Sequence, residues 1–341
     1  MNENREQFDF VVAWVDGADE AWRSERARYA EAEGIRANGD DGEARYRDWG
    51  ILKYWFRGVE TYAPWVHKVY FVTCGQLPPW LNTDCPKLVH VKHSDYIPAE
   101  FLPTFNSHTI EWNFHRISGL SERFVYFNDD MFVINRIRPE DFFVGGLPKD
   151  MLALQPVIAN ESDTVMPYIY LNNAMVLAKY FDKRENIRRQ PGSYFHPGYP
   201  PLYFFYNLLE LAFPRFTGFY TAHGPSPLKK AAYRTLWELE GDLLTKVCSH
   251  RFRERGDVSQ YLLREWQKLS GRFVPANVKR LCRYFELGGQ NGKLLQTIRR
   301  QSAKMVCVND TNRQVDEARL RQQLLAAFEE ILPQSSAFEL S

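Results

Sequence analysis

At 341 residues, the chain can bury a sizeable core and has room for one large domain or two. Its formal net charge of +1 leaves no global field to recruit nucleic acid, so any anion binding must be local. The five cysteines form no CxxC pair, which argues against a disulfide framework or a zinc site and favours a reducing compartment. The polar N-terminus lacks an apolar signal core, and no segment approaches the roughly 20 apolar residues of a membrane span.

The first part of the chain alternates between strand-like and helix-like segments. Residues 8–15 predict a first strand, and the charged residues 21–33 predict a solvated helix. Apolar runs at residues 66–73 and 88–91 predict two further strands. Such alternation is typical of a mostly parallel sheet covered by helices, so we expect an α/β fold.

A helix predicted over residues 45–62 carries charged side chains at its start, namely Arg45, Arg47 and Asp48. The N-terminus of a helix offers free N–H groups and a positive dipole end, which suits phosphate. Arginines at that end add bidentate contacts to a phosphate group. Arginines on a solvated helix face explain the same pattern equally well.

Residues 104–135 predict a helix, a turn and a buried strand. Asn106 and Ser107 are suitable N-caps for a helix that ends near Gly119. Residues 124–127 form a short apolar run without polar alternation, which is typical of a strand buried on both faces. The strand is followed at once by three polar residues, Asn128, Asp129 and Asp130.

Carboxylates at strand ends indicate a ligand site, because ligands of open α/β sheets bind beyond the carboxyl ends of the strands. Asp129 and Asp130 repel each other unless a cation lies between them or water reaches them. Hard divalent cations prefer carboxylate oxygens, so we interpret the pair as a metal site for a phosphorylated substrate. A solvated turn is the alternative. Asp16-Gly17 repeats the arrangement after the first strand, which favours a site over a simple turn there.

Beyond residue 136 the periodicity weakens. Residues 151–158 and 168–177 could be strands, and residues 201–213 could be core or an interfacial segment. Residues 314–332 predict an amphipathic helix. We expect it to dock on the core, and a membrane or partner contact is the alternative. Several polar residues of this half are site candidates. His223, in a loop with Gly and Pro, is either a general base or an ordinary surface histidine.

Two further clusters lie in the second half. The run that contains Arg251, Arg253 and Arg255 is, taken alone, typical of a solvated surface. Near the C-terminus, the apolar run at residues 306–308 ends in Asn309-Asp310, which repeats the strand-then-acid pattern.

Four blocks, in order and over most of the chain, resemble the conserved regions of the Stealth proteins. FVVAWVDGAD at residues 10–19 is similar to the first region. Residues 45–82, continuing into residues 102–132 with their FNDDMF, are similar to the second. HGPSPLKK followed by HRFRERGD resembles the third, although Ser-Pro-Leu after His-Gly-Pro departs from the family pattern. CVNDT near the C-terminus resembles the short fourth region.

The resemblance implies an activity and a fold. Stealth proteins include bacterial capsule polymerases and the catalytic subunit of the lysosomal-enzyme N-acetylglucosamine-1-phosphotransferase. By similarity, the chain transfers a hexose-1-phosphate from a nucleotide-sugar to a glycan hydroxyl, forming a phosphodiester and releasing a nucleoside monophosphate. The expected architecture is a GT-A-like, mostly parallel nucleotide-sugar-binding sheet at residues 1–145, an acceptor and catalytic part at 146–270, and a helical C-terminal part at 271–341.

The resemblance also implies roles for the candidate residues. Mg²⁺ or Mn²⁺ would be held by the acidic strand ends, namely Asp129, Asp130, Asn309 and Asp310. The catalytic set would be His223 as base with Asp130, Arg251 and Arg47. The donor would be lined by Asp16, Gly17, Arg47, Asp48, Asn106, Ser107, His108, Asn128 and Arg253. A UDP-sugar donor, a glycan acceptor and a cytoplasmic enzyme that associates peripherally with the inner membrane are expected in capsule synthesis.

Two rival functions share these residues. A metal-dependent glycosyltransferase would use the same donor site but release a nucleoside diphosphate. A non-enzymatic nucleotide-sugar sensor would bind the donor without turnover, although a pure binder needs no base.

Overall fold

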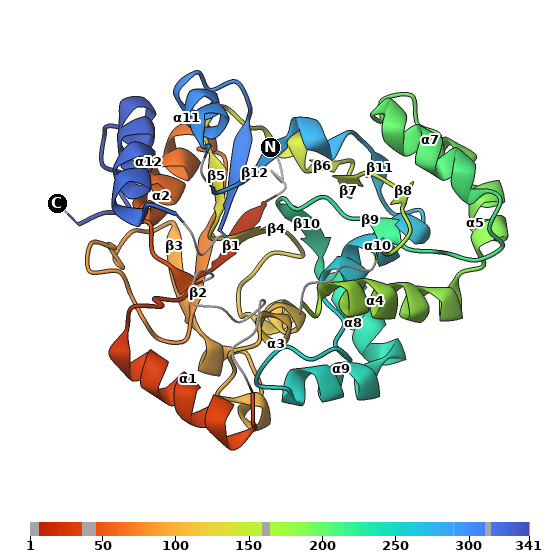
Figure 1. Ribbon diagram of the computed structural model, residues 1–341, viewed down its shortest axis with the longest axis horizontal. Coiled ribbons are helices and arrows are strands. Elements are labelled where there is room, and N and C mark those ends of the chain that lie inside the picture. The colour runs from red at the N-terminus through yellow and green to blue at the C-terminus, as the bar shows by residue number, and fades with distance from the viewer. Residues whose placement is uncertain (1–6, 36–45, 159–163, 289, 311–314, 341) are drawn as a thin grey trace, which may run out of the picture.

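A five-stranded sheet lies at the centre of the computed structural model, which describes residues 7–35, 46–158, 164–288, 290–310 and 315–340 (Figure 1). The strand order is β10-β4-β1-β2-β3. Strands β1, β2, β3 and β4 run parallel, and β10 pairs antiparallel with β4. Their bounds are β1 Asp9–Ala13, β2 Val69–Thr73, β3 Leu88–Lys92, β4 Arg123–Asn128 and β10 Ser226–Lys229. The predicted α/β class with a mostly parallel sheet is confirmed.

Alternate residues of the central strands pack into two separate cores. Phe10 and Val12 of β1 belong to one core, whereas Val11 between them belongs to the other. Phe127 and Tyr126 of β4 divide in the same way. Because both faces are covered, the strands read in the sequence as unbroken apolar runs.

One face of the sheet is covered by helices and a second, smaller sheet with strand order β12-β13-β5 (Figure 1). The helices are α2 Leu52–Tyr62, α11 Gly292–Arg299 and α12 Glu317–Ile331, and the strands are β5 Met131–Val133, β12 Cys282–Glu286 and β13 Met305–Asn309. The predicted C-terminal helix is confirmed and docks on this core through Leu320, Leu324 and Phe328. Two of the strands belong to the C-terminal part, which is therefore not purely helical.

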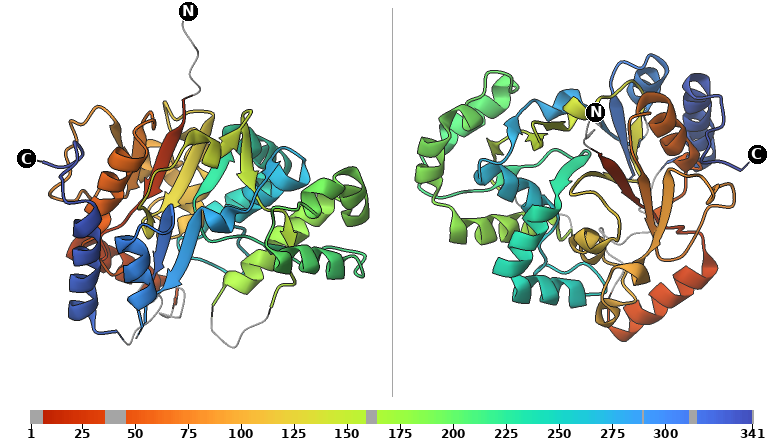
Figure 2. Two further views of the ribbon diagram at one scale, coloured as in Figure 1. Left: turned by 90° about the horizontal axis from the view of Figure 1, so that it is seen from above. Right: turned by 180° about the vertical axis from the view of Figure 1, so that it is seen from behind.

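The other face is covered by helices from the middle of the chain (Figure 2). They are α3 Ser107–Trp112, α4 Met166–Tyr180, α8 Lys230–Leu239, α9 Gly241–Ser249 and α10 Tyr261–Leu269. Peripheral helices are α1 Glu20–Ala32, α5 Lys183–Arg189, α6 Pro191–Tyr194 and α7 Pro201–Glu210. Short strands complete this part: β6 Phe143–Val144, β7 Leu147–Asp150, β8 Ala153–Leu154, β9 Phe219–Tyr220 and β11 Val274–Pro275. No helix among the described residues is long and apolar enough to cross a bilayer.

Strands from the three predicted parts of the chain are interleaved. Strand β10, from residues 146–270, completes the central sheet beside β4. Strand β5, from residues 1–145, forms the edge of the smaller sheet beside the C-terminal β13. These pairings bring residues that are far apart in sequence to the end of β4.

Three element predictions differ from the structure. The helix expected from residue 45 begins only at Leu52, because Gly50 adopts a φ of +69° that a helix cannot contain. Arg47 and Asp48 therefore lie in the loop before it, and Arg45 lies outside the described residues.

The other two differences concern α3 and α4. Helix α3 stops at Trp112, where the Asn113 side chain donates to the Thr109 carbonyl and competes with the backbone. Residues 168–177 are not a strand but part of α4, which buries Ile169, Asn173 and Leu177 at helical spacing.

A buried ion pair fixes the loop that carries His223. Arg264 of α10 binds both carboxylate oxygens of Asp150 at 2.8 and 2.9 Å, and it donates to the Ala222 carbonyl at 2.8 Å. The side chains of Arg264 and Asp150 are only 2% and 6% exposed. Removing one partner would leave the other charged and buried, which is costly.

We predict that Arg264→Met lowers the free energy of unfolding by about 3–5 kcal/mol, because Asp150 loses its bidentate partner. Arg234→Ala is the matched control, since Arg234 pairs with Glu122 at an exposed site. It should change the same free energy by less than about 1 kcal/mol. Urea unfolding followed by tryptophan fluorescence measures both. Equal, small losses would show that the buried pair does not hold this loop.

Candidate active site

The carboxyl ends of three central strands open into one pocket of about 290 Å³, which we call the acidic pocket. Its wall includes Trp14 after β1, Cys74 after β2 and Asp129 after β4. Asn309 and Asp310 reach it from β13, whose Val308 N–H donates to the Asp130 carbonyl at 2.7 Å. The carboxylates that the sequence places in distant segments therefore converge, as expected from a site at the strand ends.

Asp130 lies at the centre of this convergence. Its Oδ2 accepts a hydrogen bond from the Cys307 thiol at 3.2 Å and lies 3.4 Å from Nε2 of His223. Its Oδ1 is buried and has no hydrogen-bond partner among the residues the structure describes. Desolvation by the pocket walls, together with the charge of Asp130, raises the pKa of Asp129 to about 7. Ionisation of both carboxylates at once is therefore unfavourable unless a positive charge compensates them.

The oxygen donors of the acidic pocket fit a hard divalent cation. Asp129 and Asp130 present carboxylate oxygens, one of them an unpartnered oxygen of Asp130. Asp130, His223 and Cys307 also place one potential ligand atom each within 4.8 Å of one another. Burial and the charge of Asp130 raise the pKa of Cys307 well above its usual value, so it is a neutral thiol that donates to Asp130. A cation here would rely on oxygen ligands.

Asp310 is held mainly by cationic and indole groups. Arg47 Nη1 and Trp49 Nε1 each lie 3.1 Å from Asp310 Oδ2, and Arg47 also pairs with Glu317. The Asp310 carboxylate therefore forms its ion pair with Arg47. Arg47 and Asp48 both line the acidic pocket, although they do so from a loop and not from a helix start.

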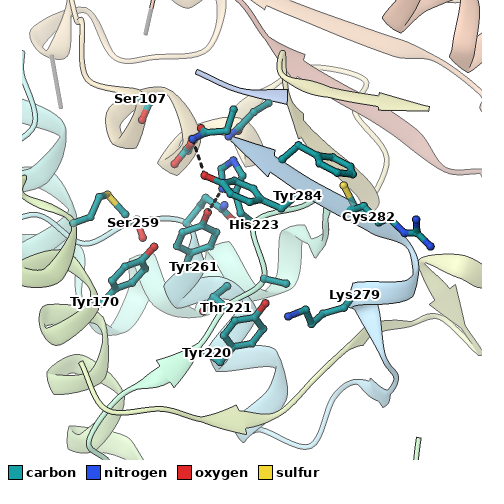
Figure 3. Close-up of a pocket in the computed structure, with 18 of the residues that line it drawn as sticks. Ser107, Tyr170, Tyr220, Thr221, His223, Ser259, Tyr261, Lys279, Cys282 and Tyr284 are labelled. Atoms are coloured by element: carbon teal, nitrogen blue, oxygen red, sulfur yellow. Dashed lines mark hydrogen bonds between the residues drawn. The ribbon is translucent and has the colours of Figure 1, made fainter. Parts of the chain in front are cut away.

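His223 stands where the acidic pocket meets a larger cavity (Figure 3). Its Nδ1 lies 3.0 Å from the Tyr261 hydroxyl, and its ring stands edge-on to the ring of Tyr284. The imidazole is therefore fixed on one side by Tyr261, while Nε2 lies toward Asp130. A histidine oriented in this way can accept a proton at Nε2.

The larger cavity has a volume of about 1140 Å³, and we call it the tyrosine cavity. Figure 3 shows Tyr170, Tyr220, Tyr261 and Tyr284 around it. The charged residues that line it are five cationic ones and one carboxylate, Glu111. The cationic residues are Arg253, Lys279, Arg283, Lys293 and Arg300. Aromatic rings and cations suit a sugar chain that carries negative charge. The tyrosine cavity is thus mainly cationic, whereas the acidic pocket contains the carboxylate pair. The wall between the two hollows includes Ser107, Asn128, His223, Arg253 and Asn309, which line both.

The two arginines singled out in the third region separate. Arg253 lines both hollows and donates to the Ser107 hydroxyl at 2.7 Å. Arg251 binds Glu33, which caps the C-terminus of α1, at 3.2 Å, and it lies over the ring of Tyr29 on that helix. Arg251 lines neither of the two hollows, so its expected catalytic role finds no support in the geometry and stays a prediction. Arg253 is the arginine that faces the shared wall.

Asn106 is a structural residue and not a donor contact. It is fully buried, caps α3 through the His108 N–H and donates to Asp257 Oδ2 at 3.0 Å. Asp257 also lies 3.3 Å from His108 Nδ1 and 2.7 Å from His250 Nδ1. This network fixes His108, which lines the tyrosine cavity and not the acidic pocket.

Asp16 and Gly17 lie beyond the pocket wall that Ala13, Trp14 and Val15 form. The Asp16 carboxylate accepts from the Ala18 N–H at 2.9 Å, so it stabilises its own turn. A Cβ at Gly17 would stand 2.2 Å from the Tyr46 carbonyl, which explains the glycine without a ligand. A simple turn therefore accounts for both residues, and their contact with a donor stays a prediction.

Glu111 is a site residue that the sequence did not single out for this role. It is buried, accepts from the Tyr126 hydroxyl at 3.0 Å and lines both hollows. Burial raises its pKa to about 7, partly offset by the positive charge of Arg253. A helix-spaced carboxylate without an adjacent acid gives no signal in a single sequence. The same holds for Tyr261 and Cys307, which act through contacts with distant segments.

The second conserved region of Stealth proteins matches residues 45–150 of the chain. The chain is 36% identical over 336 residues to a capsular polysaccharide phosphotransferase WcwK of Streptococcus pneumoniae, covering 98% of this chain and 99% of that protein. It is 37% identical to the receptor polysaccharide phosphotransferase WefC of Streptococcus oralis, covering 98% and 99%. It is 39% identical to the exopolysaccharide phosphotransferase cps2G of Lactiplantibacillus plantarum, covering 97% and 96%.

Among solved structures, the galactosyltransferase LgtC in complex with donor and acceptor sugar analogues overlaps 93% of this chain and 95% of its own. The TM-score of this overlap is 0.40 at 10% identity. The three phosphotransferases are more than one third identical to this chain, and each alignment covers nearly the full length of both proteins. The chain belongs to the Stealth family of polysaccharide phosphotransferases.

Proposed function

We propose that the protein transfers a hexose-1-phosphate from a nucleotide-sugar to a hydroxyl of a glycan acceptor in the synthesis of a cell-surface polysaccharide. The products are a phosphodiester and a nucleoside monophosphate. The observation that supports this most is the junction of an acidic pocket with a cationic, tyrosine-lined cavity at His223 and Arg253. A donor diphosphate and an acceptor hydroxyl can meet there.

In this proposal the nucleotide-sugar, with a UDP-sugar as the first candidate, lies in the acidic pocket. A divalent cation, Mg²⁺ or Mn²⁺, would be held by Asp129 and Asp130 with Asn309 beside them, and it would neutralise phosphate charge when bound. Arg47 contributes a fixed positive charge at the far wall of the same pocket. Such transfers depend mainly on positioning and on neutralising phosphate charge.

The acceptor glycan enters through the tyrosine cavity. Its hydroxyl oxygen attacks the phosphorus that carries the sugar, and the bond from that phosphorus to the bridging oxygen of the nucleotide phosphate breaks. The hydroxyl proton passes to Nε2 of His223, whose other ring nitrogen is held by Tyr261. The nucleoside monophosphate leaves with the bonding electrons. Arg253 stabilises the charge that spreads over the oxygens of the transferred phosphoryl group.

We expect the reaction with Mg²⁺ or Mn²⁺ to release a nucleoside monophosphate, because attack occurs at phosphorus and leaves the glycosidic carbon untouched. Chromatography of the released nucleotide, for a panel of nucleotide-sugars and glycan acceptors, measures this outcome. Asp130→Asn should reduce turnover by roughly 10²-fold or more, since it removes charge at the centre of the pocket. A nucleoside diphosphate as product would favour the rival glycosyltransferase. Full activity of Asp130→Asn would rule out the metal assignment.

Arg253 and Arg251 form a matched pair for testing the shared wall. Arg253→Ala should lower kcat/KM by roughly 10²- to 10³-fold, because one charge-stabilising donor at the transferred phosphate is lost. Arg251→Ala removes the same type of side chain two residues away and should change kcat/KM by less than about threefold, since Arg251 binds Glu33 at the C-terminus of α1. Steady-state kinetics with a fixed donor measures both. The reverse ranking would return the catalytic role to Arg251.

The proposal places the enzyme in the cytoplasm, where nucleotide-sugars are made, with peripheral contact to the inner membrane. A non-enzymatic sensor is less consistent with a histidine oriented by Tyr261 toward a carboxylate. Turnover of any nucleotide-sugar by the purified protein would exclude the sensor.

A further inference from the structure

Helix α7 has its polar residues on the inside. Tyr203, Asn207 and Glu210 form its buried stripe. Asn207 donates to the carbonyls of Leu152 and Tyr194 and accepts from the Leu154 N–H. Glu210 binds Lys183 of α5 at 2.8 Å, and the two side chains are 3% and 1% exposed. The side of the helix that faces the protein is therefore fully engaged through polar groups.

The outer side of α7 and the turn after it are apolar. Large side chains there are each more than 40% exposed: Leu202, Phe204, Phe205, Leu208, Leu209, Leu211 and Phe213. Scattered exposed apolar residues are normal, but a contiguous group of this size marks an interaction surface. We call this group the α7 face. The core alternative for residues 201–213 is wrong for these side chains, since between two fifths and just over half of the surface of each is exposed.

Helix α7 lies at the edge of the molecule, away from the central sheet (Figures 1 and 2). Basic side chains stand beside it. Lys183 at the start of α5 reaches the carbonyls of Glu210 and Arg215, which brings Arg184 and Arg215 to the end of α7. Along α5 and at residue 215, four exposed arginines (Arg184, Arg188, Arg189 and Arg215) outnumber two exposed carboxylates (Asp182 and Glu185).

We propose that the α7 face docks on the surface of an anionic lipid bilayer. A helix that lies in the membrane interface carries Leu and Phe on one side and has Lys or Arg near it, which pair with anionic headgroups. The arginines beside α7 complement such headgroups, whereas a second copy of the chain would bring a like-charged rim of its own. The neighbouring arginines therefore favour the bilayer as the occupant.

Docking of this face would place the bilayer close to the tyrosine cavity. Tyr203, on the inner side of α7, packs on Tyr220 with ring centroids 4.3 Å apart and accepts from Lys279 at 3.0 Å. Tyr220 and Lys279 line that cavity. The outer face of α7 is thus separated from the cavity wall by roughly one helix diameter, ~10 Å.

Co-sedimentation with vesicles tests the proposal and needs no enzymatic activity. The full chain should sediment with vesicles of phosphatidylcholine and phosphatidylglycerol (7:3) and at least tenfold less with phosphatidylcholine alone. Phe205→Glu combined with Leu209→Glu should lower the partition coefficient on the mixed vesicles at least tenfold. Arg184→Glu combined with Arg215→Glu should abolish the preference for the anionic lipid.

Leu340→Glu is the matched control, because Leu340 is 59% exposed but lies near the C-terminus, remote from α7. It should bind vesicles as the unchanged protein does. Thermal unfolding of the double α7 variant should retain the midpoint of the unchanged chain, since the altered side chains make no buried contact. Absence of binding by the unchanged protein, or undiminished binding by the folded double variant, would overturn the proposal. So would a stable dimer in analytical ultracentrifugation that the same two substitutions dissociate.

Discussion

Negative charge gathered at the end of β4 is the constraint on which the rest of the site depends. Asp129 and Asp130 are adjacent, and desolvation of Asp129 together with the charge of Asp130 raises the pKa of Asp129 to about 7. One oxygen of Asp130 is buried with no partner among the described residues. Leaving such a group uncompensated costs stability, and active sites are where proteins tolerate that cost.

The residues around Asp130 fix the position of its carboxylate but do not neutralise its charge. Cys307 and His223 approach the other oxygen of Asp130, but the thiol is neutral and Tyr261 holds the far side of the imidazole. Arg47, in the loop before α2, is engaged by Asp310 and Glu317. A ligand could supply the missing positive charge, and the cation that we propose beside the donor diphosphate would do so.

The sequence was sufficient for the parts of the fold and site that depend on local order. Apolar runs followed by acids located β1, β4 and β13, and the rule that ligands bind at strand ends placed Asp129, Asp130, Asn309 and Asp310 in one region. The family resemblance added His223 and Arg253, which no periodicity indicates.

Long-range pairing accounts for what the sequence could not show. Whether Arg251 or Arg253 faces the pocket depends on the position of α1, which supplies Glu33 to the former. The sequence cannot show whether the Asn106 amide binds a donor or another side chain. In the structure it donates to Asp257 within a buried network. The inverted polarity of α7 also needed the structure, because the sequence of residues 201–213 fits a core helix and an interfacial segment equally until its neighbours are known.

The most direct test of the central claim is the anomalous diffraction of a crystal soaked with Mn²⁺ and a nucleoside diphosphate. The account predicts a manganese peak within coordination distance, about 2.1–2.3 Å, of an Asp130 carboxylate oxygen, with the diphosphate on its other side. A diphosphate bound elsewhere, or one that occupies the acidic pocket with no metal peak beside Asp130, would contradict it.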